Sequence, residues 1–397
     1  MHNELKELEE SMRNQLKIVL GSLGMVAMLG LTSTVQGVPA FARQTGLDCN
    51  SCHASPGYPT LNTFGQAFKA GGYTQANEDN LMGDGEALSI PKTFNMSMVM
   101  KMNTELGITK TAFTNQLQFP DEIAFLAGGR VGKNIGFLVE SGNGPSLGNF
   151  KLVFAPELGP VRLGIVPFYT SGGIGAAYAF ETLSTSNAEN IRLTEGKAFT
   201  SAQQLAEWGG PAGDSTSGLG IYVWHPMGFI NYTPFVSSNG IENGPQIASS
   251  FANYFRAAIT PSFGGIDMAI GATYKMGQSD AIGADTQVIT GGKFNYLAVD
   301  AQVMGNFGLP MAIVITYANN MDTSASGVAV AVDAQVLPDL IAVTLGYRHD
   351  LTANGTGSNG GIGIKYQITR NMRFAVDGWY NIASGDITLI PNFFGAF

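Results

Sequence analysis

The residues whose types and spacing could do chemistry lie together, at Cys49-Asn50-Ser51-Cys52-His53. Two thiols three positions apart can each form a thioether to one edge of a porphyrin, and the imidazole that follows can bind the iron as its proximal ligand. The chain has only two cysteines, and both belong to this pattern. The sequence therefore predicts one covalently attached haem c, held by Cys49, Cys52 and His53.

Two other uses of a cysteine pair remain open. The thiols could form a disulfide with each other, or they could act as a thioredoxin-like redox pair. Three observations favour the haem: the histidine directly after the second cysteine, the absence of a βαβ pattern nearby, and an N-terminal export signal.

The motif lies in a short segment, residues 41–87, that differs from the rest of the chain. Its residues 60–70 have helical spacing, with Thr60 as the expected N-cap and Gly71-Gly72 as the stop. A segment this small is near the lower limit of independent folding, so either a small hydrophobic core or the haem itself must be its largest apolar object. We expect three residues on one helix face to pack against the haem: Leu61, Phe64 and Phe68.

The sixth iron ligand is predicted from proximity in the sequence. His225 and His349 lie far along the chain, whereas Met82 follows the expected helix within the same segment. Another group of methionines recurs at every second position, which is typical of one face of a strand and makes them poor ligands: Met96, Met98, Met100 and Met102.

Residues 1–40 are typical of a secretory signal peptide. Arg13 and Lys17 are basic, residues 18–31 are apolar, and Val38-Pro39-Ala40 offers a small-residue cleavage site. Cleavage after Gly37 and a retained membrane anchor are the alternatives. Acidic residues before Met12 are unusual in a signal, so translation could start at Met1 or at Met12.

Composition favours a β-barrel for residues 88–397. Charged residues make up 13% of the chain, glycines number 52 and aromatic residues reach 10%. Alternation of apolar with small or polar residues persists from about residue 93, as at Ile341, Val343 and Leu345, which is typical of strands with one apolar face.

The net charge of −9 argues against a nucleic-acid partner.

The alternation predicts about sixteen antiparallel strands, an even number, as in bacterial outer-membrane barrels. They are expected at residues 93–104, 121–131, 135–142, 149–156, 160–169, 218–224, 228–236, 251–260, 266–276, 293–304, 311–318, 328–336, 341–348, 361–368, 372–382 and 386–397. Joins after even-numbered strands are tight, and most joins after odd-numbered strands are long, as at 105–120, 170–217, 237–250 and 349–360. This pattern predicts short periplasmic turns and longer extracellular loops.

The polar faces of these strands are expected to line the lumen, and their charged residues to be solvated and mutually paired. They are Glu122, Arg130, Lys275, Asp300, Asp333, Arg348, Lys365, Arg373 and Asp377. Residues 194–208 have a helix-like pattern within the longest loop. Pro391 departs from the pattern of the last strand and is expected only at a bulge or a strand end.

Residues 39–49, the haem motif and the run Pro59-x-Leu61-Asn62-x-Phe64-Gly65-x-x-Phe68-Lys69-x-x-Gly72-Tyr73 resemble the fused cytochrome-porin family, the Cyc2-like proteins. The resemblance is specific over residues 39–100 and architectural beyond them. It implies one haem c in a small helical module that plugs the barrel lumen. It also implies an iron:cytochrome c oxidoreductase in the outer membrane.

Under this resemblance the protein would accept electrons from extracellular Fe(II) and pass them to a periplasmic c-type cytochrome. Three alternatives remain: another extracellular reductant, electron flow outward, or a diffusion porin with a redox-sensing haem appendage. Acidic loop residues, Glu189, Glu195 and Asp214, could attract Fe(II) or be solvated loop charges. The sequence leaves the redox potential and the oligomeric state open.

Overall fold

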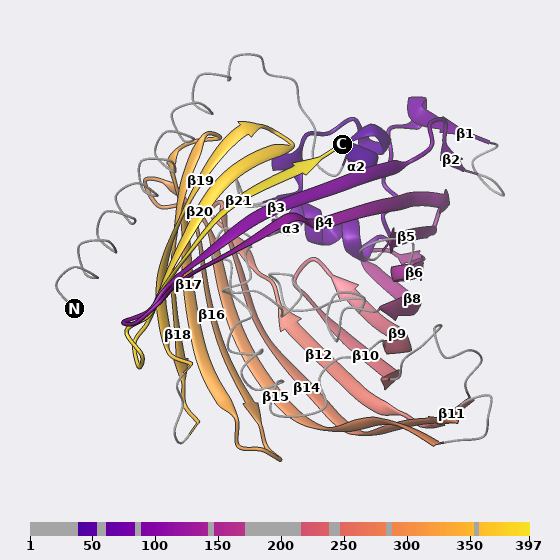
Figure 1. Cartoon of the computed structure of the whole chain (residues 1–397). Coiled ribbons are helices and arrows are strands. Elements are labelled where there is room, and N and C mark those ends of the chain that lie inside the picture. Colours follow the sequence, from indigo (N-terminus) through magenta and orange to yellow (C-terminus); the bar gives the residue numbers. More distant parts are fainter. Residues whose placement is uncertain are drawn as a thin grey trace. The chain divides into compact units, whose positions relative to one another are not determined.

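The structure is a computed structural model that describes residues 39–53, 61–83, 89–141, 147–170, 216–237, 247–282, 288–352 and 357–397. Residues 1–38 of the predicted signal peptide, the helix-like stretch 194–208 and the acidic residues Glu189, Glu195 and Asp214 lie outside these residues. The last two residues of that predicted peptide, Pro39 and Ala40, are described and begin the helix α2 (Pro39–Thr45). Figure 1 shows two short helices beside a large curved antiparallel sheet. None of the described helices is long and apolar enough to cross a membrane.

The sheet closes into a barrel because the last strand, β21, pairs with the first, β3. Its strands are β3 (Met96–Ile108), β4 (Phe113–Gly132), β5 (Ile135–Ser141), β6 (Leu147–Phe154), β7 (Glu157–Leu158), β8 (Val161–Thr170), β9 (Thr216–His225), β10 (Gly228–Ser237), β11 (Ile247–Ser250), β12 (Ala252–Ile259), β13 (Ser262–Phe263), β14 (Ile266–Ile282), β15 (Val288–Asn306), β16 (Pro310–Asn320), β17 (Ser326–Leu337), β18 (Ile341–Asp350), β19 (Asn359–Thr369), β20 (Met372–Asn381) and β21 (Ile387–Ala396).

Two of the strands around the ring are interrupted. β6 and β7 both pair with β8, and β11, β12 and β13 all pair with β14. The described residues therefore form sixteen antiparallel strands, which confirms the all-β barrel and the strand number predicted from the sequence.

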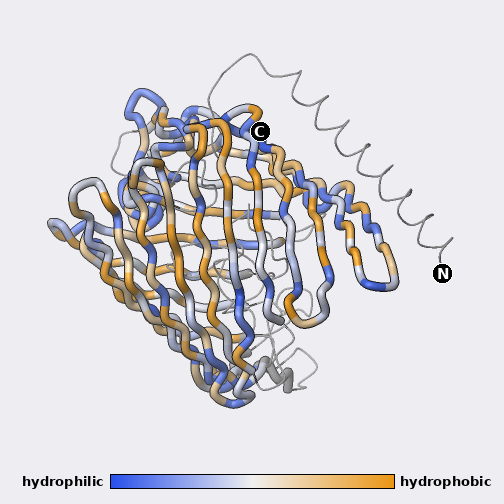
Figure 2. The backbone as a smooth tube through the Cα atoms, turned by 90° about the vertical axis from the view of Figure 1, so that its left-hand side faces the viewer, coloured by the Kyte–Doolittle hydropathy of each residue, from blue (hydrophilic) through white to orange (hydrophobic). Residues whose placement is uncertain are grey.

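Alternation along each strand separates an inner from an outer face. In β9, Tyr222 and Trp224 are buried whereas Ile221 and Val223 are exposed. Figure 2 shows orange hydrophobic stretches along the strands and blue stretches gathered at turns and loops. In β3 the methionines occupy the outward side and Ser97, Val99 and Asn103 the buried side, as the spacing predicts.

The outer face is apolar, and the inner face carries buried charged residues as well as the aromatic residues of β8 and β9. Isoleucines on three neighbouring strands are more than half exposed on the outer wall: Ile230, Ile259 and Ile270. Inside, Arg256 and Asp300 form a buried ion pair of 2.6 Å, Lys365 pairs with Asp333, and Lys101 with Glu122 at 2.5 Å. Asp300, Asp333, Lys365 and Glu122 are therefore paired on the inner face, as predicted. The expectation that these charges are solvated is wrong for Asp300 and Lys365, which are 7% and 1% exposed. Apolar outside and polar inside is the arrangement of an outer-membrane barrel, so the fold is consistent with an outer-membrane location.

The described connections include the predicted tight turns and one clear error. The long joins predicted at 170–217 and 237–250 lie mostly outside the described residues, and the one at 349–360 lies partly outside them. Tight turns join β4 to β5, β9 to β10, β17 to β18 and β19 to β20. The predicted long loop at 105–120 is wrong, because β3 continues to Ile108 and β4 begins at Phe113. The added part of β4 is polar, Thr114-Asn115-Gln116, so it lacks the apolar alternation that lipid requires, yet its backbone still pairs with β3.

Pro391 is also placed differently from the prediction. It lies in the middle of β21, paired opposite Val376 of β20. On its other side β21 pairs with β3 at Leu389–Leu106 and again at Asn392–Asn103, in one register. The barrel therefore closes around Pro391 without a bulge, since a proline that lacks an N–H forfeits one ladder bond only.

The described part of the N-terminal segment, residues 39–83, holds the remaining helices. They are α2 (Pro39–Thr45), the 3₁₀ turn η1 (Cys49–Ser51), α3 (Thr63–Ala70) and the 3₁₀ turn η2 (Glu78–Asn80), followed by the short strands β1 (Leu81–Met82) and β2 (Ile90–Pro91). The helix predicted from Thr60 begins at Thr63, because the side chain of Asn62 accepts a hydrogen bond from Gly65 N and caps it. Gly71 ends it, as predicted.

Candidate functional site

The Cys-x-x-Cys-His motif folds as a single tight turn. Asp48 caps η1 by accepting hydrogen bonds from Asn50 N at 3.0 Å and Ser51 N at 3.3 Å. Cys49 O accepts from Cys52 N at 3.1 Å and from His53 N at 2.9 Å. The two cysteines are partly buried and are not disulfide-bonded. Two unbonded thiols on one turn, followed by an imidazole, form a donor set that fits a haem c.

Helix α3 packs directly against this turn. The backbone N–H of Asn62 donates to Cys52 O at 2.9 Å, and its side chain donates to Ser51 O at 3.1 Å. His53 and Leu61 form an isolated antiparallel bridge. A Cβ at Gly65 would overlap Cys52 O, so only glycine permits this approach of helix to motif.

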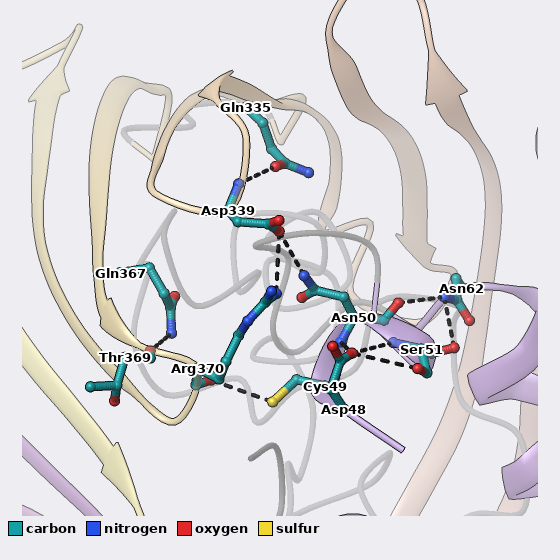
Figure 3. A network of polar contacts seen from close by, with 10 residues as sticks. All are labelled: Asp48, Cys49, Asn50, Ser51, Asn62, Gln335, Asp339, Gln367, Thr369 and Arg370. Atoms are coloured by element: carbon teal, nitrogen blue, oxygen red, sulfur yellow. Dashed lines mark hydrogen bonds and ion pairs between the residues drawn. The ribbon is translucent and has the colours of Figure 1, made fainter. Parts of the chain in front are cut away.

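The motif also contacts the tight-turn end of the barrel (Figure 3). The Cys49 thiol donates to Arg370 O, in the β19–β20 turn, at a sulfur–oxygen distance of 3.4 Å. Asn50 Nδ2 donates to Asp339 Oδ1, in the β17–β18 turn, at 2.6 Å. Arg370 Nη1 lies 3.4 Å from the same Asp339 oxygen.

Asp339 takes a backbone conformation that non-glycine residues seldom adopt, with φ at 61°. Its N–H donates to Gln335 Oε1 at 2.9 Å, which holds the turn in place. Because aspartate tolerates the left-handed region better than most residues, it can occupy this turn and still present its carboxylate to Asn50 and Arg370.

Burial raises the pKa of the Cys49 thiol to about 11. Burial, followed by the negative charge of Asp48, also raises the pKa of Cys52. Redox-active cysteine pairs need a lowered thiol pKa so that a thiolate is present at neutral pH. The environment of the motif therefore disfavours the thioredoxin-like alternative for these two thiols.

A second part of the N-terminal segment packs on the inner wall of the barrel. Phe41 of α2 stacks on Tyr73 at 5.1 Å between ring centroids, and Phe68 of α3 meets both rings edge-on at 5.2 and 5.7 Å. Phe68 and Tyr73 belong to one buried cluster with inner-wall residues of β6, β8 and β9. Tyr222 of β9 donates to Ala70 O at 2.5 Å.

Glycines on adjacent strands make this packing possible. A Cβ at Gly136 of β5 would overlap Gly72 O, and one at Gly164 of β8 would overlap the ring of Tyr222. At Gly128 of β4 a Cβ would lie 3.2 Å from the Phe41 ring. We call Gly128 and Gly136 the glycine surface, because their missing side chains leave room for Phe41 and Gly72 of the N-terminal segment. Gly164 leaves room for the barrel's own Tyr222.

The predicted haem-packing residues are separated in the structure. Phe68 is 6% exposed and packs in the aromatic cluster, whereas Phe64 is 37% exposed. Leu61 lies beside the motif through its bridge to His53. Met82 is 46% exposed and pairs with Ile90 in the β1–β2 ribbon. Asn80, just before this ribbon, donates a 2.9 Å hydrogen bond to Arg43 O of α2.

Sequence reasoning missed the residues that fix the segment to the barrel. They are Gln44, Phe41, Tyr73, Tyr222, Asp339 and Arg370. One feature of the sequence could have indicated which strand the segment lies against. Gly128-Gly129 interrupts an otherwise alternating strand, and a glycine inside a strand often marks a close backbone approach.

Elsewhere in the described residues, no group of three or more His, Cys, Asp or Glu side chains could hold a metal ion. His225 ends β9 at a tight turn, and His349 lies at the loop end of β18, where its Nδ1 is 3.0 Å from Ser358 Oγ.

No protein-family model matches the sequence, and no curated protein matches it. Among solved structures, a chain described as "Asymmetric conductivity of engineered proteins" is 12% identical, with a TM-score of 0.46. A mutant of the Rh. blastica porin is 11% identical, also with a TM-score of 0.46. Both alignments cover 76% of this chain and 100% of the other. The strand pairing of this chain itself defines a porin-like β-barrel.

Proposed function

We propose that this chain is an outer-membrane electron conduit, with one haem c attached at Cys49 and Cys52 and ligated by His53. Electrons would enter from extracellular Fe(II) and leave to a periplasmic c-type cytochrome. The observation that carries the proposal is the contact of the attachment motif with two tight turns of a closed barrel, through Arg370 and Asp339.

The contact of the motif with the barrel matters because the barrel is proposed to span the outer membrane. The hydrocarbon layer is about 30 Å thick, and a soluble carrier cannot cross it. A sixteen-stranded barrel encloses a lumen wide enough to hold more than its own side chains. A redox group held at the mouth of that lumen can be approached from the periplasm and, through the lumen, from outside.

The contacts of the N-terminal segment support its role as a plug. They fall at separate places around the ring: α2 on β3 and β4, Ala70 on β9, and the motif on the β17–β18 and β19–β20 turns. A segment touching these places extends across the opening. The glycine surface lets it approach the wall closely.

The roles of the individual residues follow from their chemistry. Haem c, when bound, supplies a one-electron carrier. Cys49 and Cys52 provide the thioether sulfurs, His53 the proximal nitrogen, and Met82 the proposed sixth ligand. Leu61, beside His53, and Phe64, on the exposed side of α3, are proposed to pack on the porphyrin. Phe68 is buried against Phe41 and Tyr73 instead, where it holds α3 to the barrel wall.

Fe(II) as the donor rests on the resemblance of residues 39–100 to Cyc2-like proteins. Purified protein in proteoliposomes, with its haem spectrum recorded while Fe(II) is added outside, tests the proposal. We expect the reduced haem bands to appear. Reduction only by a periplasmic cytochrome would instead assign outward flow, and a protein without covalent haem would overturn the conduit.

The polar inner wall favours a second candidate, a diffusion porin with a haem appendage. Porins have a polar interior, and this inner wall carries ion pairs such as Arg256–Asp300 and Lys365–Asp333. Single-channel conductance separates the two candidates. A plugged conduit should conduct ions poorly, whereas a porin should conduct continuously.

A further inference from the structure

Gln44 of α2 is a polar side chain that is only 1% exposed. Its Nε2 donates to Tyr73 O at 2.6 Å and to Gln75 O at 2.8 Å. Its Oε1 accepts from Asn95 Nδ2 at 3.1 Å and from Arg130 N at 3.0 Å. All the donors and lone pairs of the amide are therefore used.

These four bonds join two different parts of the chain. Tyr73 and Gln75 belong to the N-terminal segment, in the stretch that follows α3. Asn95 directly precedes β3, and Arg130 lies in β4, so both belong to the barrel. One buried amide thus connects α2, the stretch after α3 and the barrel wall.

The backbone of β4 leaves room for the amide of Gln44. Gly129 of β4 has φ at 140°, a conformation that side chains seldom adopt. A Cβ there would overlap Gln44 Oε1 and lie 2.8 Å from Asn95 Nδ2. A register shift in the β4–β5 pairing follows at Arg130, and the Arg130 guanidinium donates to Thr74 O at 3.2 Å.

We propose that Gln44 is a positioning residue that holds the N-terminal segment in the barrel and so keeps the lumen closed to solutes. The inference rests on the proposed position of this segment as a plug, but it does not depend on haem attachment. Without Gln44, the buried groups that bond to its amide would need water as a partner. The N-terminal segment would then detach from the barrel wall more often.

The test is single-channel conductance of the full-length protein in planar bilayers. For Gln44→Ala and Gln44→Met we expect open events to be more frequent by on the order of a hundredfold, since each loses all four bonds. Asn95→Ala removes one bond and should give about a fivefold increase. Gln75→Ala is the matched control, because only the backbone oxygen of Gln75 bonds to Gln44, and it should match the wild type.

Methionine fills the volume of glutamine without its hydrogen bonds. Wild-type conductance in Gln44→Met beside frequent opening in Gln44→Ala would show that Gln44 acts by volume, and this would overturn the inference. So would wild-type conductance in Gln44→Ala. A heat-modifiable band on a gel confirms a folded barrel for each variant. If Gln44→Ala does not fold, Asn95→Ala decides the outcome.

Haem staining of the same samples keeps the two proposals apart. Wild-type protein that lacks covalent haem contradicts the electron conduit but leaves the conductance result intact. Protein with haem, whose conductance ignores Gln44 and Asn95, contradicts the positioning role and leaves the conduit standing.

Discussion

The barrel and the N-terminal segment are stabilised in different ways. Each barrel strand is bonded on both sides by a ladder, such as the long pairing of β14 with β15, so apart from the β3–β21 closure the wall is held by strands that follow each other in the chain. The segment has two short helices and a two-residue ribbon, and its buried residues contact distant strands. The barrel can therefore be expected to fold without the segment, whereas the segment depends on the barrel.

The largest expected effect is the loss of covalent haem from the N-terminal segment with no change in the barrel. Replacing both cysteines, Cys49→Ala with Cys52→Ala, should abolish covalent haem because neither thioether can form. Haem staining after denaturing electrophoresis measures this, and heat-modifiability measures the barrel, which should be unchanged. His225→Ala is the control and should keep the haem, since His225 ends β9 whereas the motif contacts the β17–β18 and β19–β20 turns. Retained covalent haem in the double variant would contradict the assigned site.

The next effect concerns the barrel alone. Asp300→Ala leaves the buried guanidinium of Arg256 without its carboxylate and should cost about 4 kcal/mol in the free energy of unfolding. Urea unfolding in detergent micelles measures it. The matched control is Lys293→Ala, which breaks an exposed pair with Asp322 and should cost less than about 1 kcal/mol. Equal losses in the two variants would show that the inner pair is hydrated like a surface pair.

A third change acts on the segment alone. Phe68→Ala removes the ring that packs edge-on against Phe41 and Tyr73 and should destabilise the segment by about 3 kcal/mol. Hydrogen exchange in residues 39–83 should become faster, while exchange in β14 and β15 stays slow. Gln66→Ala, on the same helix but outside the aromatic cluster, is the control. Faster exchange throughout the barrel would mean that the two regions unfold together.

The smallest effect tests the contact between motif and turn. Asp339→Gly removes the carboxylate that binds Asn50 and Arg370 but suits the positive φ of the turn. Because these groups are partly exposed, the loss should be below about 1 kcal/mol. Faster hydrogen exchange at residues 49–53, with no change in the barrel, is the expected result. Asp386→Gly, in the β20–β21 connection, should leave those residues unaffected.

Local patterns in the sequence determined most of the barrel. Alternation with a period of two specifies a strand with two faces, so the outward methionines of β3 and the inward Asp333 and Lys365 were predictable. The start of β4 was not, because its polar residues lack alternation and only backbone pairing with β3 makes them part of the strand. The assignment of residues 49–53 to haem attachment stays a prediction from their residue types and spacing.

Tertiary structure alone decided where that motif lies. Cys49 meets the carbonyl of Arg370 across 321 positions of sequence, and no local pattern encodes such a contact. Gln44 is an ordinary polar residue in a short helix until the closed barrel brings Asn95 and Arg130 to its amide. The reason is physical: alternation and spacing act between near neighbours, whereas the closing of sixteen strands sets which distant backbone groups become partners.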